Sequence, residues 1–257
     1  MATPDDHAPD DRAPDDHALA AAVAAEAGAR LVALRESLAG ASAGEVGARG
    51  DQASHRFISS ALAAARPGEP VLSEEGADDQ RRLRAQRVWV VDPLDGTREF
   101  AEGRTDWAVH VALVVGGRPV AAAVALPSRG LTLHTGAPPG PLPPHHGPLR
   151  LVVSRSRPPA MASALAARLR AELVVLGSAG AKAMAVVLGE AEAYVHEGGQ
   201  YEWDSAAPVA VAAAAGLHVS RLDGSTLRYN QADPWLPDLL VCRADVAGAI
   251  LAAVSLR

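Results

Sequence analysis

The fold is decided by residues 88–97, which read Val88-Trp89-Val90-Val91-Asp92-Pro93-Leu94-Asp95-Gly96-Thr97. The first four residues form an apolar run rich in β-branched side chains, which is typical of a strand buried on both faces. Two carboxylates follow directly, and Pro93 between them forces a bend. The side chains of Asp92 and Asp95 and the carbonyl of Leu94 can therefore converge on one point. Three oxygen donors suit a hard cation such as Mg²⁺, and two buried acids without a partner would be unfavourable.

The turn after Asp95 adds a second chemical feature. The backbone N–H groups of Gly96 and Thr97 can face an anion, as in phosphate-binding nests. Asp-Gly pairs are also common in ordinary turns, so Asp95-Gly96 could be structural only. The whole string D-P-L-D-G-T directly after a buried strand favours a metal and phosphate site.

Three further acids stand at the ends of predicted elements. Glu74 follows a short strand at 70–72, and Asp51 and Asp204 open predicted helices. Asp is a standard helix N-cap, so Asp51 and Asp204 could be caps alone. With Asp92 and Asp95, these acids could instead hold two or three cations about 3.5–4 Å apart, the arrangement used for in-line phosphoryl hydrolysis.

Outward from this point, the hydrophobic periodicity indicates two halves. Helices are expected first, then strands, with Gly116-Gly117 marking a hairpin; in the second half strands and helices alternate. This pattern predicts a layered α/β (α+β) protein in two parts. We expect a disordered acidic tail over 1–18, an N-terminal α+β part with most metal ligands over 19–137, and a C-terminal α/β part over 149–257. The elements expected are helices near 16–38, 51–66, 158–170, 179–188, 204–215 and 244–254, and strands near 70–72, 88–91, 107–115, 119–126, 149–153, 173–176, 191–196, 223–224 and 239–242.

Composition excludes several classes of protein. The chain has 257 residues and a net charge of -6, so a broad nucleic-acid surface, which needs a basic excess, is not expected. We expect no membrane span, because no apolar run reaches about 18 residues. Cys242 is the single cysteine, which rules out an internal disulfide and favours a reducing, cytoplasmic location.

The second half offers a second anion site. Ser154 and Arg155 follow a predicted strand, and the Gly/Ser-rich loop 177–180, with Ser178 and Gly180, opens a helix that carries Lys182. Lys182 is the only lysine in the chain, and an ammonium suits a phosphate as a point charge. For Arg155 an exposed basic turn is the alternative.

At this point the sequence resembles the lithium-sensitive, magnesium-dependent phosphatases of the inositol monophosphatase superfamily. The segments S-E-E at 73–75, D-P-L-D-G-T at 92–97 and W-D-S-A-A at 203–207 match that family's metal motifs in order and rough spacing. The stretches 97–100, 153–159, 177–184, 202–208 and 222–231 are most similar to the actinobacterial CysQ-like branch, the 3′(2′),5′-bisphosphate nucleotidases. The resemblance implies a layered αβαβα sandwich. Pro208 departs from the glycine that is more frequent there, which argues against a simple transfer of inositol recognition.

The resemblance also implies roles. Glu74, Asp92 and the Leu94 carbonyl would hold a first Mg²⁺, and Asp92, Asp95 and Asp204 a second. Thr97 with Asp51 would orient or deprotonate the attacking water, and Asp51 could hold a third ion through water. The implied catalytic residues are Asp51, Glu74 and Thr97. The implied substrate-binding residues are Asp95, Gly96, Thr97, Arg98, Ser154, Arg155, Ser178, Gly180, Lys182 and Asp204.

The implied reaction is removal of the 3′-phosphate of adenosine 3′,5′-bisphosphate (PAP) to give AMP and phosphate, in sulfate assimilation. The sulfate-bearing analogue PAPS is a second candidate substrate, Li⁺ is the implied inhibitor, and a homodimer is expected. Within the family, inositol-1-monophosphatase and fructose-1,6-bisphosphatase activities are alternatives. A haloacid-dehalogenase phosphatase would carry D-x-D-G-T rather than D-x-x-D-G-T, and a non-catalytic Mg²⁺-dependent nucleotide sensor would bind ligand without releasing phosphate.

Overall fold

The computed structural model describes residues 15–158 and 160–255. Residues 1–14 of the predicted acidic tail lie outside the described residues. The tail boundary at residue 18 is too late, because helix α1 begins at Asp16. Asp15 caps this helix by accepting the Ala18 N–H at 2.6 Å, and Asp16 forms ion pairs with Arg66 and Arg87, each at 3.0 Å. Asp15 and Asp16, near the end of the predicted tail, are therefore ordered by contacts with the rest of the protein.

The first sheet is mostly antiparallel and carries the segment 88–97. Its strand order is β1-β2-β3-β4-β5, with β1 parallel to β2 and the other pairs antiparallel. The β3–β4 hairpin occurs where Gly116-Gly117 predicted it, and β5 is an addition that the sequence pattern did not reveal. The strands are β1 (Val71–Ser73), β2 (Arg87–Asp95), β3 (Ala108–Val115), β4 (Arg118–Leu126) and β5 (Leu131–His134).

The second sheet is mixed. Its order is β7-β6-β8-β10-β9; β6 is parallel to β7 and β8, whereas β10 is antiparallel to β8 and β9. The segment 135–149 that joins the two sheets contains no helix or strand, in the region expected as a boundary. The strands are β6 (Arg150–Ser154), β7 (Glu172–Leu176), β8 (Ala193–Tyr201), β9 (His218–Ser220) and β10 (Trp235–Cys242).

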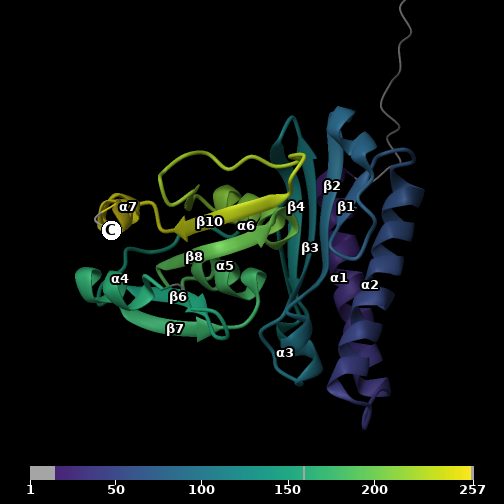
Figure 1. Cartoon of the computed structure of the whole chain (residues 1–257), viewed down its shortest axis with the longest axis horizontal. Coiled ribbons are helices and arrows are strands. Elements are labelled where there is room, and N and C mark those ends of the chain that lie inside the picture. The colour runs from purple at the N-terminus through teal and green to yellow at the C-terminus, as the bar shows by residue number, and fades with distance from the viewer. Residues whose placement is uncertain (1–14, 159, 256–257) are drawn as a thin grey trace, which may run out of the picture.

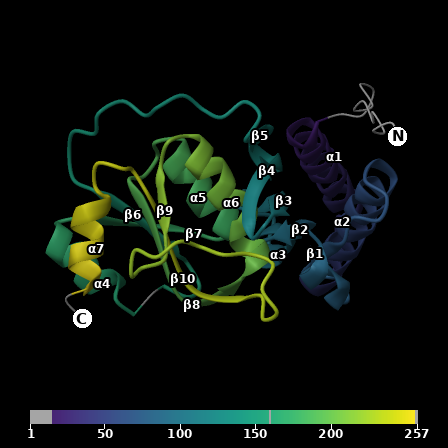
Figure 2. The same cartoon turned by 90° about the horizontal axis from the view of Figure 1, so that it is seen from above.

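Helices complete five layers, as Figures 1 and 2 show. Helices α1 and α2 cover the outer face of the first sheet, α5 and α6 lie between the sheets, and α4 and α7 cover the outer face of the second. This arrangement confirms the expected αβαβα sandwich. The helices are α1 (Asp16–Ser37), α2 (Ala43–Ala65), α3 (Thr97–Ala101), α4 (Ala162–Leu169), α5 (Ala179–Val187), α6 (Glu202–Ala214) and α7 (Ala247–Ser255), with short 3-10 turns at Gln80–Arg84 and Pro127–Arg129.

The buried side chains of β2 explain why this strand holds the layers together. Val88 and Val90 pack in the core between the two sheets, whereas Trp89 and Val91 pack in the core beneath α1 and α2. A strand alternates its side chains between the two faces of a sheet. The continuous apolar run therefore serves two cores, and β2 is buried on both faces as predicted.

Helix α2 begins earlier than the sequence pattern predicted. Ser42 caps it by accepting the Glu45 N–H at 3.2 Å, so Asp51 lies within the helix and is not its N-cap. Two glycines that precede the predicted start of the helix lie within it and make close contacts: a Cβ at Gly47 would lie 3.0 Å from Thr97 Cγ2, and one at Gly50 would lie 2.8 Å from Leu94 Cδ2. Glycine lets α2 approach the end of β2 closely, which places Asp51 beside Thr97.

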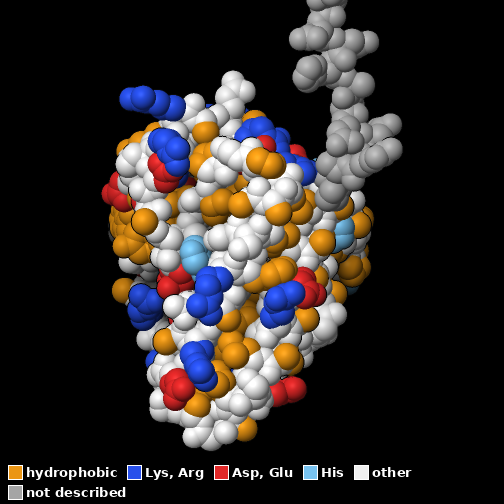
Figure 3. Space-filling view, turned by 90° about the vertical axis from the view of Figure 1, so that its right-hand side faces the viewer, with side chains coloured by type: hydrophobic (Ala, Val, Ile, Leu, Met, Phe, Trp, Pro, Cys, Tyr) orange, Lys and Arg blue, Asp and Glu red, His pale blue; other side chains and the backbone are white. Residues whose placement is uncertain are grey.

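Among the described residues, α1 alone has the length and apolar composition that would allow it to cross a membrane. In this fold Leu19, Val23 and Leu31 of α1 are buried in the core beneath the first sheet, which accounts for its apolar composition. Figure 3 looks onto this side of the molecule, where basic and acidic side chains are scattered among hydrophobic ones.

Candidate active site

Carboxylates from distant parts of the chain meet at the end of β2. One oxygen atom from each of Asp92, Asp95 and Asp204 lies within 4.8 Å of the other two. The pairing of β2 with β3 shifts register between Asp92 and Asp95, which is the bend predicted at Pro93. The Ser54 hydroxyl of α2 holds this bend by donating to the Pro93 carbonyl at 2.6 Å. Asp204 arrives from the first turn of α6.

Asp92 is the most deeply buried of these acids, with 1% of its surface exposed. The Leu94 N–H donates to its Oδ1 at 3.1 Å. Burial, followed by the charges of Asp95 and Glu74, raises the pKa of Asp92 well above its usual value. A carboxylate in this position is strongly disfavoured unless a cation neutralises it.

Asp95 has its own set of donors. The Gly180 N–H donates to Oδ2 at 2.5 Å and the Ala179 N–H to Oδ1 at 3.1 Å, and His110 Nε2 lies 3.1 Å from Oδ2. Burial raises the pKa of Asp95, but the His110 charge, the Lys182 ammonium and the Gly180 N–H outweigh it, and the pKa lies below its usual value. Asp95 is therefore ionised at neutral pH.

Glu74 and Asp204 complete the acidic group. Burial and the charge of Asp204 raise the pKa of Glu74 to about 7. Burial and the charge of Asp95 likewise raise the pKa of Asp204 to about 6, although the Tyr201 N–H donates to its Oδ2 at 2.6 Å. Both acids hold protons more tightly than free carboxylates do, because they repel one another across a poorly solvated space.

Thr97 and Asp51 form a hydrogen-bonded pair beside the acids. The Thr97 hydroxyl lies 2.8 Å from Asp51 Oδ1 and 3.2 Å from the Leu94 carbonyl. Burial raises the pKa of Asp51 to about 6, with a smaller lowering from the Thr97 hydrogen bond. A pKa in this range is one that suits a group for general acid–base chemistry near neutral pH.

A cavity of about 750 Å³ opens over these groups, which is large enough for a nucleotide-sized ligand. Three of the predicted site residues do not line this cavity: Asp51, Arg155 and Gly180. Asp51 lies behind Thr97, and Gly180 lies behind Asp95 as its N–H donor. The predicted residues that do line the cavity are Glu74, Asp92, Leu94, Asp95, Gly96, Thr97, Arg98, Ser154, Ser178, Lys182 and Asp204.

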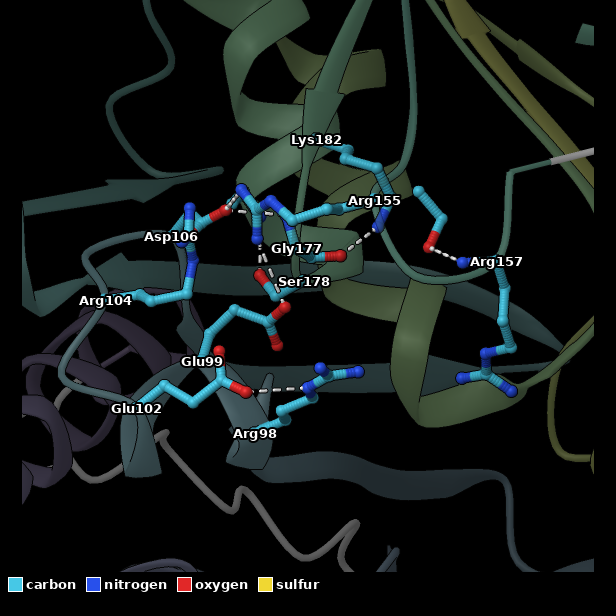
Figure 4. A network of polar contacts seen from close by, with 12 residues as sticks. Arg98, Glu99, Glu102, Arg104, Asp106, Arg155, Arg157, Gly177, Ser178 and Lys182 are labelled. Atoms are coloured by element: carbon cyan, nitrogen blue, oxygen red, sulfur yellow. Dashed lines mark hydrogen bonds and ion pairs between the residues drawn. The ribbon is translucent and has the colours of Figure 1, made fainter. Parts of the chain in front are cut away.

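Arg155 is occupied by protein partners. It pairs with Asp106, and its Nη1 lies 3.4 Å from Glu99 Oε1. Asp106 also accepts the Gly177 N–H at 2.7 Å, so this cluster joins the loop after β7 to the segment that follows α3. Figure 4 shows Arg155 directed into this cluster while Arg157 points away from it. The exposed Arg157 lines the cavity instead.

Lys182 is a buried cation whose charge acts on Asp95 and Asp204. It is 4% exposed, donates to the Gly177 carbonyl, and its Nζ lies 5.3 Å from the centre of the Tyr194 ring. Burial lowers the pKa of Lys182 to about 8, even though Asp95 and Asp204 raise it. The ammonium is still mostly charged at neutral pH and faces the cavity.

His110 was assigned no chemistry from the sequence, yet it contacts Asp95 directly. It is fully buried, and its Nδ1 donates to the Trp203 carbonyl at 3.0 Å. Burial lowers the pKa of His110. Asp95 and the hydrogen bond to the Trp203 carbonyl raise it by more, so the pKa lies above its usual value. The hairpin register was the available signal, because His110 stands opposite Asp92 in the β2–β3 ladder.

The residues fit a divalent cation. Asp92, Asp95 and Asp204 supply carboxylate oxygens, and Leu94 lines the same cavity beside Glu74. Oxygen donors of this kind are those that Mg²⁺ prefers. Burial and the neighbouring carboxylates raise the pKa values of Asp92 and Glu74, and a bound cation would offset both effects.

The fold and the site together define a class of protein. It is a layered αβαβα protein in which carboxylates from several layers meet at one cavity. The family described as "Inositol monophosphatase family" matches residues 16–140 and 149–254. The chain belongs to the inositol monophosphatase family.

Relatives within this family are close. The chain is 51% identical over 253 residues to the 3′-phosphoadenosine 5′-phosphate phosphatase of Mycobacterium leprae (strain TN), covering 92% of each chain. It is 34% identical over 198 residues to the 3′(2′),5′-bisphosphate nucleotidase CysQ of Escherichia coli (strain K12), covering 72% of this chain and 80% of that one. Among solved structures, CysQ from Bacteroides thetaiotaomicron superposes with a TM-score of 0.73 at 28% identity, covering 88% of this chain and 96% of that one. These relatives support the CysQ-like branch that the sequence motifs indicated.

Proposed function

We propose that the chain is a Mg²⁺-dependent phosphomonoesterase, a 3′(2′),5′-bisphosphate nucleotidase that converts PAP to AMP and phosphate. The observation that carries this proposal is the cluster of Asp92, Asp95 and Asp204 within 4.8 Å, in a cavity that also holds cationic side chains. The 51% identity to a 3′-phosphoadenosine 5′-phosphate phosphatase supports the choice of substrate.

The acids that meet at the end of β2 would bind the metal ions. Glu74, Asp92 and the Leu94 carbonyl would hold one Mg²⁺, and Asp92, Asp95 and Asp204 another; a third ion near Asp51 is part of the same proposal. When bound, the ions would stabilise the negative charge that develops on the phosphoryl group and on the leaving oxygen. The Asp92 carboxylate belongs to both sets of ligands and would be shared by both ions.

The attacking water is assigned to Thr97 and Asp51. Thr97 Oγ1 accepts a proton from water while its own proton passes to Asp51, 2.8 Å away. The pKa of about 6 for Asp51 leaves it ionised at neutral pH and able to take that proton. Gly96 and Thr97 open α3 at the cavity, where their N–H groups would bind the 3′-phosphate.

The second phosphate would bind to polar and cationic groups from the C-terminal half of the chain. Lys182, Ser178, Ser154 and Arg157 line the cavity from that half, and Arg98 follows Thr97 directly in α3. We keep these residues as substrate contacts. Arg155 and Gly180 are reassigned to positioning, because Arg155 is paired with Asp106 and Gly180 donates to Asp95. PAPS, which carries a sulfated 5′-phosphate, would fit the same groups.

The remaining parts of the proposal concern the cell. We propose that the enzyme clears PAP during sulfate assimilation in the cytoplasm, that Li⁺ inhibits it by competing at a Mg²⁺ position, and that it forms a homodimer. Sedimentation velocity of the purified protein tests the last point.

The decisive assay is phosphate release from PAP, PAPS, inositol 1-phosphate and fructose 1,6-bisphosphate, with Mg²⁺ and with added Li⁺. PAP is expected to have the highest kcat/KM, and preference for inositol 1-phosphate or fructose 1,6-bisphosphate would overturn the substrate assignment. Ligand binding without phosphate release would instead indicate a sensor. Trapping of a phospho-aspartate would indicate the haloacid-dehalogenase mechanism.

Replacement of Asp95 by Asn tests the metal assignment. Asp95→Asn removes one charge from the cluster and leaves the side-chain shape unchanged, so kcat is expected to fall by about a thousandfold or more. Asp223→Asn, which alters an exposed acid outside the cavity lining, is the matched control and should retain most of the activity. Normal turnover by Asp95→Asn would disprove the proposed mechanism.

A further inference from the structure

One wall of the cavity is aromatic. Tyr201, Trp203 and Trp235 all line it, and Tyr201 and Trp235 are 46% and 48% exposed. The rings of Tyr201 and Trp203 are stacked, with centres 4.8 Å apart and planes 12° from parallel. Large aromatic surfaces left open in a cavity are typical of sites that bind a partly apolar ligand.

The backbone of the second sheet builds this wall. Tyr201 and Trp235 are direct partners in the β8–β10 ladder, so their side chains share one side of the sheet. The ladder then bulges, because two residues, Gly198 and Gly199, stand opposite one residue of β10. A Cβ at Gly199 would lie only 2.5 Å from Trp235 Nε1, and its φ is +92°. Glycine at 199 therefore allows the indole to lie against β8.

The aromatic wall adjoins the reacting groups. Trp203 immediately precedes Asp204, and its carbonyl accepts a hydrogen bond from His110, which contacts Asp95. The Tyr201 N–H donates to Asp204 at 2.6 Å. A substrate whose phosphate lies at Asp95 and Asp204 can thus place the rest of its structure against these rings.

We propose that Tyr201, Trp203 and Trp235 form a stacking platform for the nucleobase, with Trp235 as the main specificity-determining residue. This inference rests on the proposed nucleotidase function and extends it to the base. Every nucleobase has a flat π-face that stacks on aromatic side chains, whereas the hydroxylated rings of inositol and fructose phosphates have none. The platform would favour nucleotides over these sugar phosphates while the phosphate groups bind in the same way.

A pair of substrates isolates the contribution of the base. PAP is compared with an abasic analogue, 1-deoxyribose 3,5-bisphosphate, in wild type, Trp235→Ala and Trp235→Phe. Wild type is expected to prefer PAP by at least about tenfold in kcat/KM, and this preference should largely vanish in Trp235→Ala and persist in Trp235→Phe. Val120→Ala, which alters an equally exposed apolar side chain away from the cavity, should leave the preference unchanged.

Calorimetric titration with AMP in Mg²⁺ provides a second readout that does not require turnover. Trp235→Ala is expected to weaken AMP binding by about tenfold. Equal kcat/KM for PAP and the abasic analogue in wild type would overturn the platform and leave the phosphatase proposal intact. Absence of phosphate release from both substrates would overturn the phosphatase proposal, and AMP binding that is identical in wild type and Trp235→Ala would overturn the platform in either case.

Discussion

A threonine hydroxyl carries one proton, and that of Thr97 faces two acceptors. Asp51 Oδ1 at 2.8 Å is nearer than the Leu94 carbonyl at 3.2 Å, and the carboxylate is the stronger acceptor. With the proton directed to Asp51, the oxygen of Thr97 can accept a proton from water. This geometry supports the proposed roles of Thr97 as a relay and Asp51 as the final base.

Thr97→Ala removes this relay without changing an acidic ligand. We expect kcat to fall by roughly 10²- to 10⁴-fold, the range typical of a lost general base, while the Mg²⁺ concentration for half-maximal activity changes little. In wild type, kcat should decrease as the pH falls through about 6, because Asp51 with that pKa must be ionised to accept the proton.

Thr97→Ser is the control for this prediction. It retains the hydroxyl and should keep most of the wild-type kcat, measured by phosphate release at saturating PAP. Equal losses in Thr97→Ser and Thr97→Ala would mean that the methyl group, which packs near Gly47, matters more than the relay.

Arg157 is an exposed cation of the cavity lining, in the loop that follows β6. Arg157→Ala is expected to raise KM for PAP by about tenfold, as for a lost charge-assisted hydrogen bond, and to leave KM for 3′-AMP unchanged because that substrate lacks the 5′-phosphate. Arg118→Ala, in an exposed arginine at the start of β4, is the matched control. An equal rise in KM for both substrates would show that Arg157 does not bind the 5′-phosphate.

The sequence was a good guide to residues that share one short motif and a weaker guide elsewhere. Asp92, Leu94, Asp95 and Thr97 lie within six positions, so local geometry limits where they can point. Arg155 and Arg157 occur in one loop with the same charge, and only the position of Asp106 decides that Arg155 is paired and Arg157 faces the cavity. That partner lies 49 residues away in the chain.

At the scale of elements, the packing of α2 decides where Asp51, the proposed catalytic base, lies. Gly47 and Gly50 are one turn apart on the helix face that meets α3 and the end of β2. Glycine lowers helix stability by about 1 kcal/mol relative to alanine, and the sequence pattern predicted that the helix begins only after these residues, at Asp51. In the structure both glycines lie within α2, because only glycine permits the close approach that places Asp51 at Thr97.

Alanine substitutions on α2 separate packing from helix propensity. Gly50→Ala would place a Cβ 2.8 Å from both Leu94 Cδ2 and Phe100 Cε1, and we expect it to lower the free energy of unfolding by about 1–3 kcal/mol through overpacking. Gly44→Ala, at a position with nothing within 4 Å, should raise it by up to about 1 kcal/mol. Urea denaturation measures both, and stabilisation by Gly50→Ala would disprove the close-contact explanation.

At the scale of the whole molecule, the site exists only where the layers meet. Asp51 comes from the outer helical layer, Asp92 and Asp95 from the first sheet, and Asp204 from the helices between the sheets. The chain must fold completely to bring these charges together. The repulsion among them therefore acts against the native state and is relieved by protons or by bound cations.

The sign of the resulting pH dependence follows from the pKa values. The pKa values of Glu74, about 7, and Asp204, about 6, lie above those of the unfolded chain, and the pKa of Asp92 is raised as well. The native state thus binds more protons than the unfolded chain between about pH 5 and 8, so without metal its stability falls as the pH rises through this range. Asp95 and Asp106, whose pKa values are lowered, act mainly below this window.

Magnesium should reverse this trend, because cations that bind only the native state replace the protons lost from the acids. At Mg²⁺ concentrations about a hundredfold above Kd, we expect about 2.7 kcal/mol of stabilisation, or roughly 5–10 °C in Tm for a chain of this size. The gain should be larger at pH 8 than at pH 5, because Glu74 is protonated at pH 5 and the raised pKa of Asp92 favours its acid form there too. Thermal denaturation at both pH values, with NaCl at equal ionic strength as control, measures it. A Mg²⁺ effect that is independent of pH, or one that persists in Asp92→Asn, would show that the ions bind elsewhere.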